Sequence, residues 1–405
     1  MFDEICQDMG LGSEIELLER EWDLSGEIFP GPEAIFFLSD KFIGKYADIV
    51  GVDVDGIAHL LEIAAKLRQN LESARFLWHL YYLLWVSPNR LDALPVDPPA
   101  PGGYSSDIAA TQFLLLTLAG CPAAEALHRQ YDIPEVIFRD TLEDIGGWVN
   151  YFRDELGWTS GVSPHVANWL LCHTRGEIFR LGRLQFKPKR SFPDYLRVYR
   201  HRGDGKLLAL AAPGQRFNSQ GYYDGVSGAH DPNAWESVFK VTDSSVTGNQ
   251  IDAHGYAWKE TMTFDLAEWE EYIMPGDNML DIHIPATGPM SPMECMESIS
   301  LATVFFRKYF PGDEFKGFIC TSWLLDPQFK DFIPADSNIL AFQRLGLLFP
   351  VPDESEAVWR VFGLKSRDDG INSVQHKTSL QRSLAEFARD GGRFRSGGML
   401  ITIES

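Results

Sequence analysis

The sequence is poor in the features that mark secreted and membrane-spanning proteins. It has only five cysteines in 405 residues, an odd and widely spaced set that gives neither a disulfide framework nor paired metal-binding cysteines. No run reaches the ~18 uninterrupted apolar residues that a helix needs to cross a bilayer. The first residues are acidic and lack the basic and apolar regions of a secretory signal. We therefore expect a reduced, cytoplasmic protein with no membrane-spanning segment.

Positive charge is also scarce. The chain has 36 Lys and Arg against 57 Asp and Glu, which leaves a net charge of −21. Such a field repels phosphate backbones and anionic lipid, so we expect neither a nucleic-acid nor a membrane partner. The one basic patch, Lys187–Arg190 with three further arginines up to Arg202, fits the exposed faces of neighbouring strands. The same charges could also meet an anionic cofactor.

Length and hydrophobic content favour two globular domains, the first of them helical. Within Ile57–Val86, apolar residues recur at helical spacing. Residues 91–104 are rich in proline and glycine and must form a loop. Beyond it, Pro122 fits a first helical turn, and further helices are expected over residues 108–118, 134–142 and 144–158. Residues 1–165 are therefore predicted to form an all-α domain.

After Gly176, short alternating runs separated by turn residues replace the helical pattern, as is typical of strands. Gly203-Asp204-Gly205 predicts a tight hairpin. Strands are expected over residues 177–186, 195–202, 206–211, 255–266, 279–284, 315–324, 358–364 and 399–404.

Fewer helices are expected in this second half. Asp265 can cap a short helix through residue 273, and Ser291, Pro292 and Glu294 predict a capping box for a helix through residue 309. Two more are expected over residues 335–345 and 380–389. Residues 166–405 are therefore predicted to form an α+β domain with a mixed sheet.

Several short segments resemble a known bacterial family. They are Ile133-Pro134 with Thr141–Ile145 in the first half, and Arg183–Phe186, Asp281–Pro285, Cys320–Pro327 and Asp336–Asn338 in the second. The family is that of acyltransferases with a helical N-acyltransferase-type N-terminal domain and a GNAT-like C-terminal domain. The resemblance implies a fold akin to N-acetyltransferases, in which two central strands splay apart and admit the pantetheine arm of an acyl-CoA. It does not imply a particular substrate.

Acyl transfer from a thioester requires a site for the pyrophosphate of the donor. Thr287, Gly288, Met290 and Ser291 lie in the segment that joins a predicted strand to a helix N-terminus, where free N–H groups attract anions. We predict that this loop binds acetyl-CoA or another acyl-CoA. It has one glycine, and its prolines remove donors, whereas the resembled enzymes usually have a glycine-rich loop here. An ordinary capped helix explains the pattern equally well.

Proton transfer and carbonyl polarisation require further groups. Alternation along Met279–Pro285 places Asp281 and His283 on one face of the strand, so His283 is the candidate base and Asp281 its orienting partner. On the second strand, Ser322 is a candidate donor to the thioester oxygen. Cys320 is the candidate nucleophile of an alternative, covalent mechanism with His283 as base. Structural roles, a histidine bonded to the backbone and a packed cysteine, are the simpler alternatives.

A polar, glycine-rich segment from Gly214 to Gly255 carries tyrosines, histidines and aspartates. Such groups suit a sugar or a polar amine, and a long hairpin connection is the alternative explanation. No phosphate-binding loop, nucleophile elbow or paired-histidine zinc motif is present, so we expect no metal.

Together these features predict an acyl-CoA-dependent N-acyltransferase that acts on a small amine. The alternative from another class is a non-catalytic protein that binds a metabolite or partner on the same scaffold. The sequence does not predict the oligomeric state.

Overall fold

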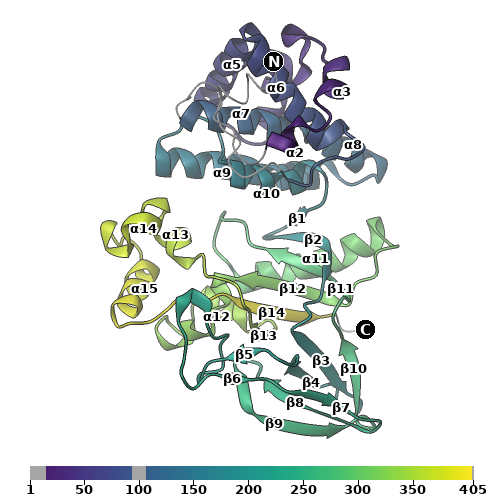
Figure 1. The fold of residues 1–405 in the computed structure, drawn as a ribbon, viewed down its shortest axis with the longest axis vertical. Coiled ribbons are helices and arrows are strands. Elements are labelled where there is room, and N and C mark those ends of the chain that lie inside the picture. The colour runs from purple at the N-terminus through teal and green to yellow at the C-terminus, as the bar shows by residue number, and fades with distance from the viewer. Residues whose placement is uncertain (1–14, 94–105, 404–405) are drawn as a thin grey trace. The chain divides into compact units, whose positions relative to one another are not determined.

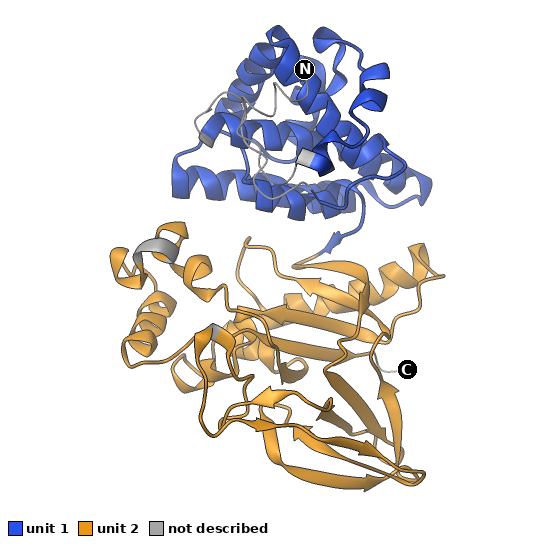
Figure 2. Cartoon of the chain, viewed as in Figure 1, with its two compact units in different colours: residues 1–181 blue, residues 182–405 orange. Residues whose placement is uncertain are grey.

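The computed structural model describes residues 15–93 and 106–403, so most of the expected loop at 91–104 and the N-terminal segment with Cys6 lie outside the described residues. The chain divides into two compact units, residues 1–181 and 182–405 (Figure 2). This division comes later than the boundary expected after residue 165. The reason is helix α10 (Pro164–Thr174), which packs against helices α7, α8 and α9 of the first unit.

The first unit is helical, as predicted (Figure 1). The helix expected over 57–86 is interrupted at Asn70, whose side chain accepts a hydrogen bond from the Ser73 N–H and so begins a new helix. The two helices expected over 134–158 form one. The helices of this unit are α2 (Ile15–Glu19), α3 (Trp22–Glu27), α4 (Asp40–Ile49), α5 (Val54–Gln69), α6 (Leu71–Tyr81), α7 (Ser106–Ala119), α8 (Cys121–Gln130), α9 (Glu135–Leu156) and α10.

Helix α7 forms the apolar centre of this unit. The helical stretch Asp107–Gln130 is long and apolar enough to cross a membrane by length and composition, but 72% of its apolar window is buried inside the protein. Residues 113–119 of α7 are all buried. Burial of this kind is expected of the core helix of a helical domain.

Among the described residues, the second unit contains two large sheets and the small two-stranded sheet β5–β6, where the sequence predicted one mixed sheet. In the mixed sheet the strands lie in the order β2-β11-β12-β14-β13, and in the antiparallel sheet the order is β10-β3-β4-β8-β7, with β9 paired to β8. The strands are β2 (Leu184–Ser191), β3 (Leu196–His201), β4 (Leu207–Ala211), β5 (Arg216–Phe217), β6 (Trp235–Glu236), β7 (Phe239–Val241), β8 (Ser245–Ile251), β9 (Ala257–Asp265), β10 (Trp269–Ile273), β11 (Asn278–His283), β12 (Gly317–Ser322), β13 (Leu347–Pro350) and β14 (Gly397–Thr402).

One apolar core joins the two sheets. Val198 and Ala209 of the antiparallel sheet pack in the same cluster as Met279, Ile319 and Leu400 of the mixed sheet. The helices of this unit are α11 (Pro292–Tyr309), α12 (Asn338–Gln343), α13 (Ala357–Phe362), α14 (Leu364–Asp369) and α15 (Ser379–Arg389). Helix α11 connects the neighbouring parallel strands β11 and β12, which is the connection that parallel strands require.

Three expected elements of this unit differ from the structure. The strand expected over 177–186 is broken at Gly182, whose φ of 73° turns the chain between β1 (Phe179–Leu181) and β2. The helix expected after Asp265 is wrong, because the Asp265 carboxylate accepts the Ala267 N–H in a turn and β10 follows, paired with β3.

The strand expected over 358–364 is also wrong. Most of these residues instead belong to helix α13, because Ala357 and Phe362 pack against Leu384 and Ala385 of α15. By contrast, the hairpin at residues 203–205 is confirmed, with Arg200 of β3 opposite Leu207 of β4.

Candidate functional site

Strands β11 and β12 part in the middle of the mixed sheet. Their parallel pairing comprises two positions among the described residues, Leu280 opposite Phe318 and Asp281 opposite Ile319. Beyond them, each strand continues against its outer neighbour: His283 lies opposite Gln185 of β2, and Ser322 lies opposite Gly397 of β14. Among the described residues, the carboxyl ends of the two strands therefore do not pair with each other, which agrees with the splayed strands that the resemblance implies.

Asp281 and His283 lie together at this opening. The Nε2 atom of His283 is 3.3 Å from the Oδ2 atom of Asp281, and the two side chains are 29% and 16% exposed. Gln185, which is 1% exposed, lies opposite His283 in the β2–β11 pairing. The geometry thus gives a partly exposed imidazole whose Nε2 atom is buried next to a carboxylate that can orient the ring.

Cys320 and His283 lie on opposite faces of the sheet. Residues paired across neighbouring strands point to the same face, so Asp281 and His283 share the face of Ile319, which packs toward the antiparallel sheet. Cys320 follows Ile319 and points the other way. Cys320 is 1% exposed, and burial, with the negative charge of Asp281, raises the pKa of its thiol well above the ordinary value.

The expected pairing of Cys320 with His283 therefore does not form, because the strand register separates the two side chains. A buried thiol that stays protonated is a poor nucleophile. The cysteine-dependent alternative loses its geometric basis.

Ser322 and Asp326 follow strand β12. The Ser322 hydroxyl accepts the Leu324 N–H at 3.2 Å and caps a short 3-10 helix, which leaves its own O–H able to donate. Asp326 is fully buried and accepts the N–H groups of Gln328 and Arg395 at 3.0 and 2.9 Å. Burial raises the pKa of Asp326 to about 6, against the opposing effect of these hydrogen bonds.

The loop between β11 and α11 is held by a residue to which the sequence gave no role. The Arg183 guanidinium donates to the carbonyl oxygens of Pro289, Pro285 and Gly288 at 2.9, 3.1 and 3.1 Å. Because C=O and N–H of one peptide unit point in opposite directions, the N–H of Met290, which shares a peptide unit with the Pro289 carbonyl, points away from Arg183. The clamp therefore fixes both the path of the loop and the direction of its donors.

The candidate donor-binding residues lie along this clamped loop. Gly288 has a φ of 74° and open space where a side chain would be, whereas Met290 is 8% exposed. Ser291 precedes α11 but its side chain makes no capping hydrogen bond, so the expected capping box with Glu294 is not formed. The Ser291 side chain thus leaves the first-turn N–H groups of α11 to other partners. Thr287 is partly buried beside Gly288.

A second contact that was not predicted from the sequence connects the start of β2 to helix α11. The buried Ser298 hydroxyl accepts the N–H groups of Arg183 and Leu184 at 2.8 and 3.3 Å. Its partners lie more than a hundred positions earlier in the chain, so spacing along the sequence carries no signal for either Ser298 or the Arg183 clamp.

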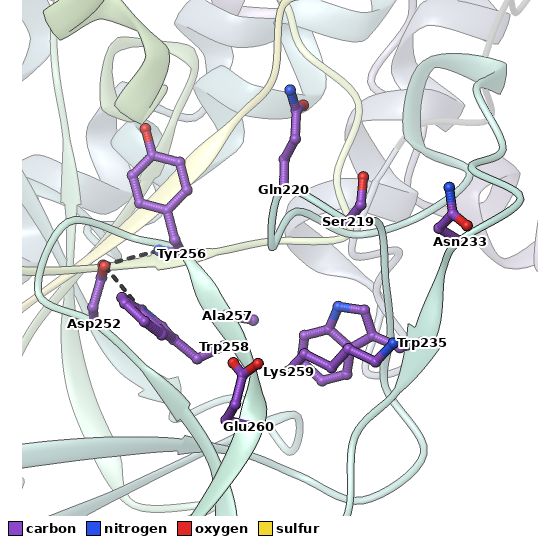
Figure 3. Close-up of a pocket in the computed structure, with 10 residues that line it drawn as sticks. All are labelled: Ser219, Gln220, Asn233, Trp235, Asp252, Tyr256, Ala257, Trp258, Lys259 and Glu260. Atoms are coloured by element: carbon purple, nitrogen blue, oxygen red, sulfur yellow. Dashed lines mark hydrogen bonds between the residues drawn. The ribbon is translucent and has the colours of Figure 1, made fainter.

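The segment from Gly214 to Gly255 contributes to a cavity of about 440 Å³ in the second unit (Figure 3). Its lining residues all fall within positions 219–260, so the cavity shares none with the residues at the strand opening. In the described ranges, 15–93 and 106–403, no group of three or more His, Cys, Asp and Glu side chains could hold a metal ion.

Comparison with known proteins agrees with this architecture. Residues 43–176 match the N-acyltransferase N-terminal domain, and residues 178–400 match the GNAT-like C-terminal domain. No curated protein matches the chain. Similar solved structures include an acyltransferase in complex with decanoyl-CoA and teicoplanin, with 18% identity and a TM-score of 0.65.

A mutant acyltransferase in complex with octanoyl-CoA is similar at 17% identity and a TM-score of 0.65. Each comparison covers 100% of this chain and 99% of the other. The fold over the whole length is therefore that of these acyltransferases. The chain belongs to the family that has an N-acyltransferase N-terminal domain followed by a GNAT-like C-terminal domain.

Proposed function

We propose that this protein transfers an acyl group from an acyl-CoA to an amine of a small molecule. The observation that carries the proposal is the parting of β11 and β12 after Asp281 and Ile319, with the Asp281–His283 pair at the opening. Backbone edges without a strand partner can bind an extended, amide-containing chain such as pantetheine. The similar acyltransferases were solved with octanoyl-CoA, decanoyl-CoA and teicoplanin, which supports an acyl-CoA donor and a small-molecule acceptor.

The loop from Thr287 to Ser291 would bind the pyrophosphate. The N–H groups of the loop and of the first turn of α11 would donate to it, and the Arg183 guanidinium would add positive charge nearby. Since Ser291 does not cap α11, no side chain of the cap residue competes with the ligand for these donors.

The chemical step is a direct attack of the amine nitrogen on the thioester carbonyl. His283 would take the proton that the nitrogen loses, and Asp281 would stabilise the imidazolium that forms. Backbone N–H groups at the strand ends would stabilise the negative oxygen of the tetrahedral intermediate. The Ser322 hydroxyl, predicted from the sequence as such a donor, follows Cys320 by two residues and so lies on the face opposite His283. When the C–S bond breaks, His283 can return the proton to the departing CoA thiolate, so the step balances.

The experiment that tests this proposal measures free thiol released from octanoyl-CoA, decanoyl-CoA and acetyl-CoA in the presence of a panel of primary amines. We expect release that depends on one class of amine, together with the acylated amine detected by mass spectrometry. Release without an acylated amine would identify a thioesterase and contradict the proposal.

A non-catalytic binding protein is the second candidate, and a specific observation favours it. Pro289 and Pro292 lack N–H groups, and Glu294 places a negative charge in the first turn of α11, where an anion would bind. Binding of CoA without transfer to any amine would favour this candidate.

A further inference from the structure

The cavity in the second unit has the size of a small-molecule site. Its volume is about 440 Å³, within the ~300–1,000 Å³ usual for such sites. It is lined by Ser219, Gln220, Asn233, Trp235, Asp252, Tyr256, Ala257, Trp258, Lys259 and Glu260 (Figure 3). Strand β9 supplies one wall, and the loops that flank β5 and β6 supply the other.

The loop wall of the cavity is rigidly built. Asp231 accepts the N–H groups of Ser219 and Asn233 at 2.7 and 2.8 Å, and so holds two lining residues with one carboxylate. Gly221 has a φ of 86°, and a Cβ there would lie 2.4 Å from the Ala257 carbonyl oxygen. Only glycine therefore allows this loop to approach β9 so closely. The polar groups of the wall are held in place before any ligand binds.

An aromatic platform occupies the opposite wall. Trp258 is 53% exposed, which is unusual for a large ring in a folded domain. Its indole N–H donates to Asp252 Oδ2 at 3.2 Å, and the other oxygen of Asp252 accepts the Tyr256 N–H (Figure 3). That oxygen also accepts the His254 N–H. The carboxylate is thus fixed by the backbone and in turn orients the exposed indole.

Besides the rings of Trp235 and Tyr256, the remaining lining is mainly polar and carries an excess of negative charge. Asp252 and Glu260 are opposed by Lys259 alone, and Gln220 and Asn233 supply amides that both donate and accept. Aliphatic surface is limited to Ala257. A purely apolar ligand would leave these polar groups without partners, and an anionic ligand would be repelled by the carboxylates.

We propose that this cavity binds a saccharide ring that carries no anionic group. A saccharide has a C–H face, which packs on the negative face of an indole, and an edge of hydroxyl groups, which pairs with amides and carboxylates. An amino group on the ring would add attraction to Asp252 and Glu260. The site is separate from the opening between β11 and β12 and does not depend on the proposed acyl transfer.

The test is titration calorimetry of the whole protein, without CoA, against methyl glucoside, methyl glucosaminide and methyl glucuronide. We expect millimolar or tighter binding of the first two and binding of the glucuronide weaker by at least about tenfold. Trp258→Ala should weaken the glucoside by about tenfold, whereas Trp258→Phe, which keeps an aromatic face, should recover most of the affinity.

Val241→Ala is the matched control, because it truncates another exposed side chain of the same antiparallel sheet. Circular dichroism of each variant would verify folding. No binding of any glycoside at high millimolar concentration, or equal affinity in Trp258→Ala and the control, would overturn the proposal. Affinity for CoA should be the same in all of these proteins, so failure here is distinguishable from failure of the proposed transferase.

Discussion

Arg183→Ala removes the clamp that holds the loop between β11 and α11. The guanidinium donates hydrogen bonds to three carbonyl groups of this loop. Gly288 and Pro289 are exposed, so water can satisfy their carbonyl groups in the variant. We therefore expect a modest loss of stability, about 1–2 kcal/mol, measured by urea unfolding.

We expect Arg183→Ala to impair function mainly by weakening the binding of CoA, because the variant stays folded after its modest loss of stability. The variant loses one positive charge near the expected pyrophosphate site and also loses the fixed direction of the loop N–H groups. Together these losses are worth about 1.4–2 kcal/mol, or about 10–30-fold in the Kd for CoA. The assay is calorimetric titration with CoA, alongside the KM for acyl-CoA once an acceptor is known.

Two further variants separate charge from geometry. Arg183→Lys keeps the charge but not the planar fork, so it should recover only part of the affinity. Arg307→Ala removes the same charge from an exposed position in the last turn of α11 and should leave CoA binding unchanged. Equal Kd values for Arg183→Ala, Arg307→Ala and the unchanged protein would refute the role given to the clamp.

Three other predictions follow from the site. His283→Ala should lower kcat by about 10²–10⁴, while the free energy of unfolding changes by less than about 1 kcal/mol. The control His165→Ala, at an exposed position of α10, should change neither quantity. Parallel losses of activity and stability in His283→Ala would indicate a structural histidine. Cys320 should react with iodoacetamide far more slowly in the native protein than in urea, because it is buried and the pKa of its thiol is raised. Mass spectrometry would follow the reaction. Rapid alkylation of the native protein with loss of activity would instead support the covalent mechanism. The pKa of Asp326 is about 6 in the folded protein and lower in the unfolded chain, so the folded state binds the extra proton and the free energy of unfolding falls as pH rises. In urea unfolding, the unchanged protein should lose about 1 kcal/mol of stability relative to Asp326→Asn between about pH 5 and 7. A difference between the two proteins that does not depend on pH would contradict this.

The elements that build the site were predictable because local residues mark their ends. Pro275-Gly276-Asp277 turns the chain into β11, Pro292 begins α11, and Pro311-Gly312 follows its last turn. These signals act within a few residues and need no tertiary context. The Asp281–His283 pair was predictable for the same reason, since alternation along one strand brings residues two apart to the same face.

The predictions that were wrong, and the features that were not predicted, depend on contacts between segments that are distant in the sequence. The opposite faces of Cys320 and His283 follow from the register of β12 against β11, which no residue of either strand specifies alone. Helix α13 forms because α15 covers its apolar residues, and Arg183 binds carbonyls about a hundred residues away along the chain. The second sheet likewise required a core shared between strands that are far apart in sequence.

The most direct test of the central claim is calorimetric titration of the purified protein with octanoyl-CoA. The claim is that the opening between β11 and β12, with the clamped loop beside it, is an acyl-CoA site. We predict micromolar binding at one site per chain that is weakened by Arg183→Ala and not by Arg307→Ala. Absence of binding at millimolar octanoyl-CoA would contradict the claim.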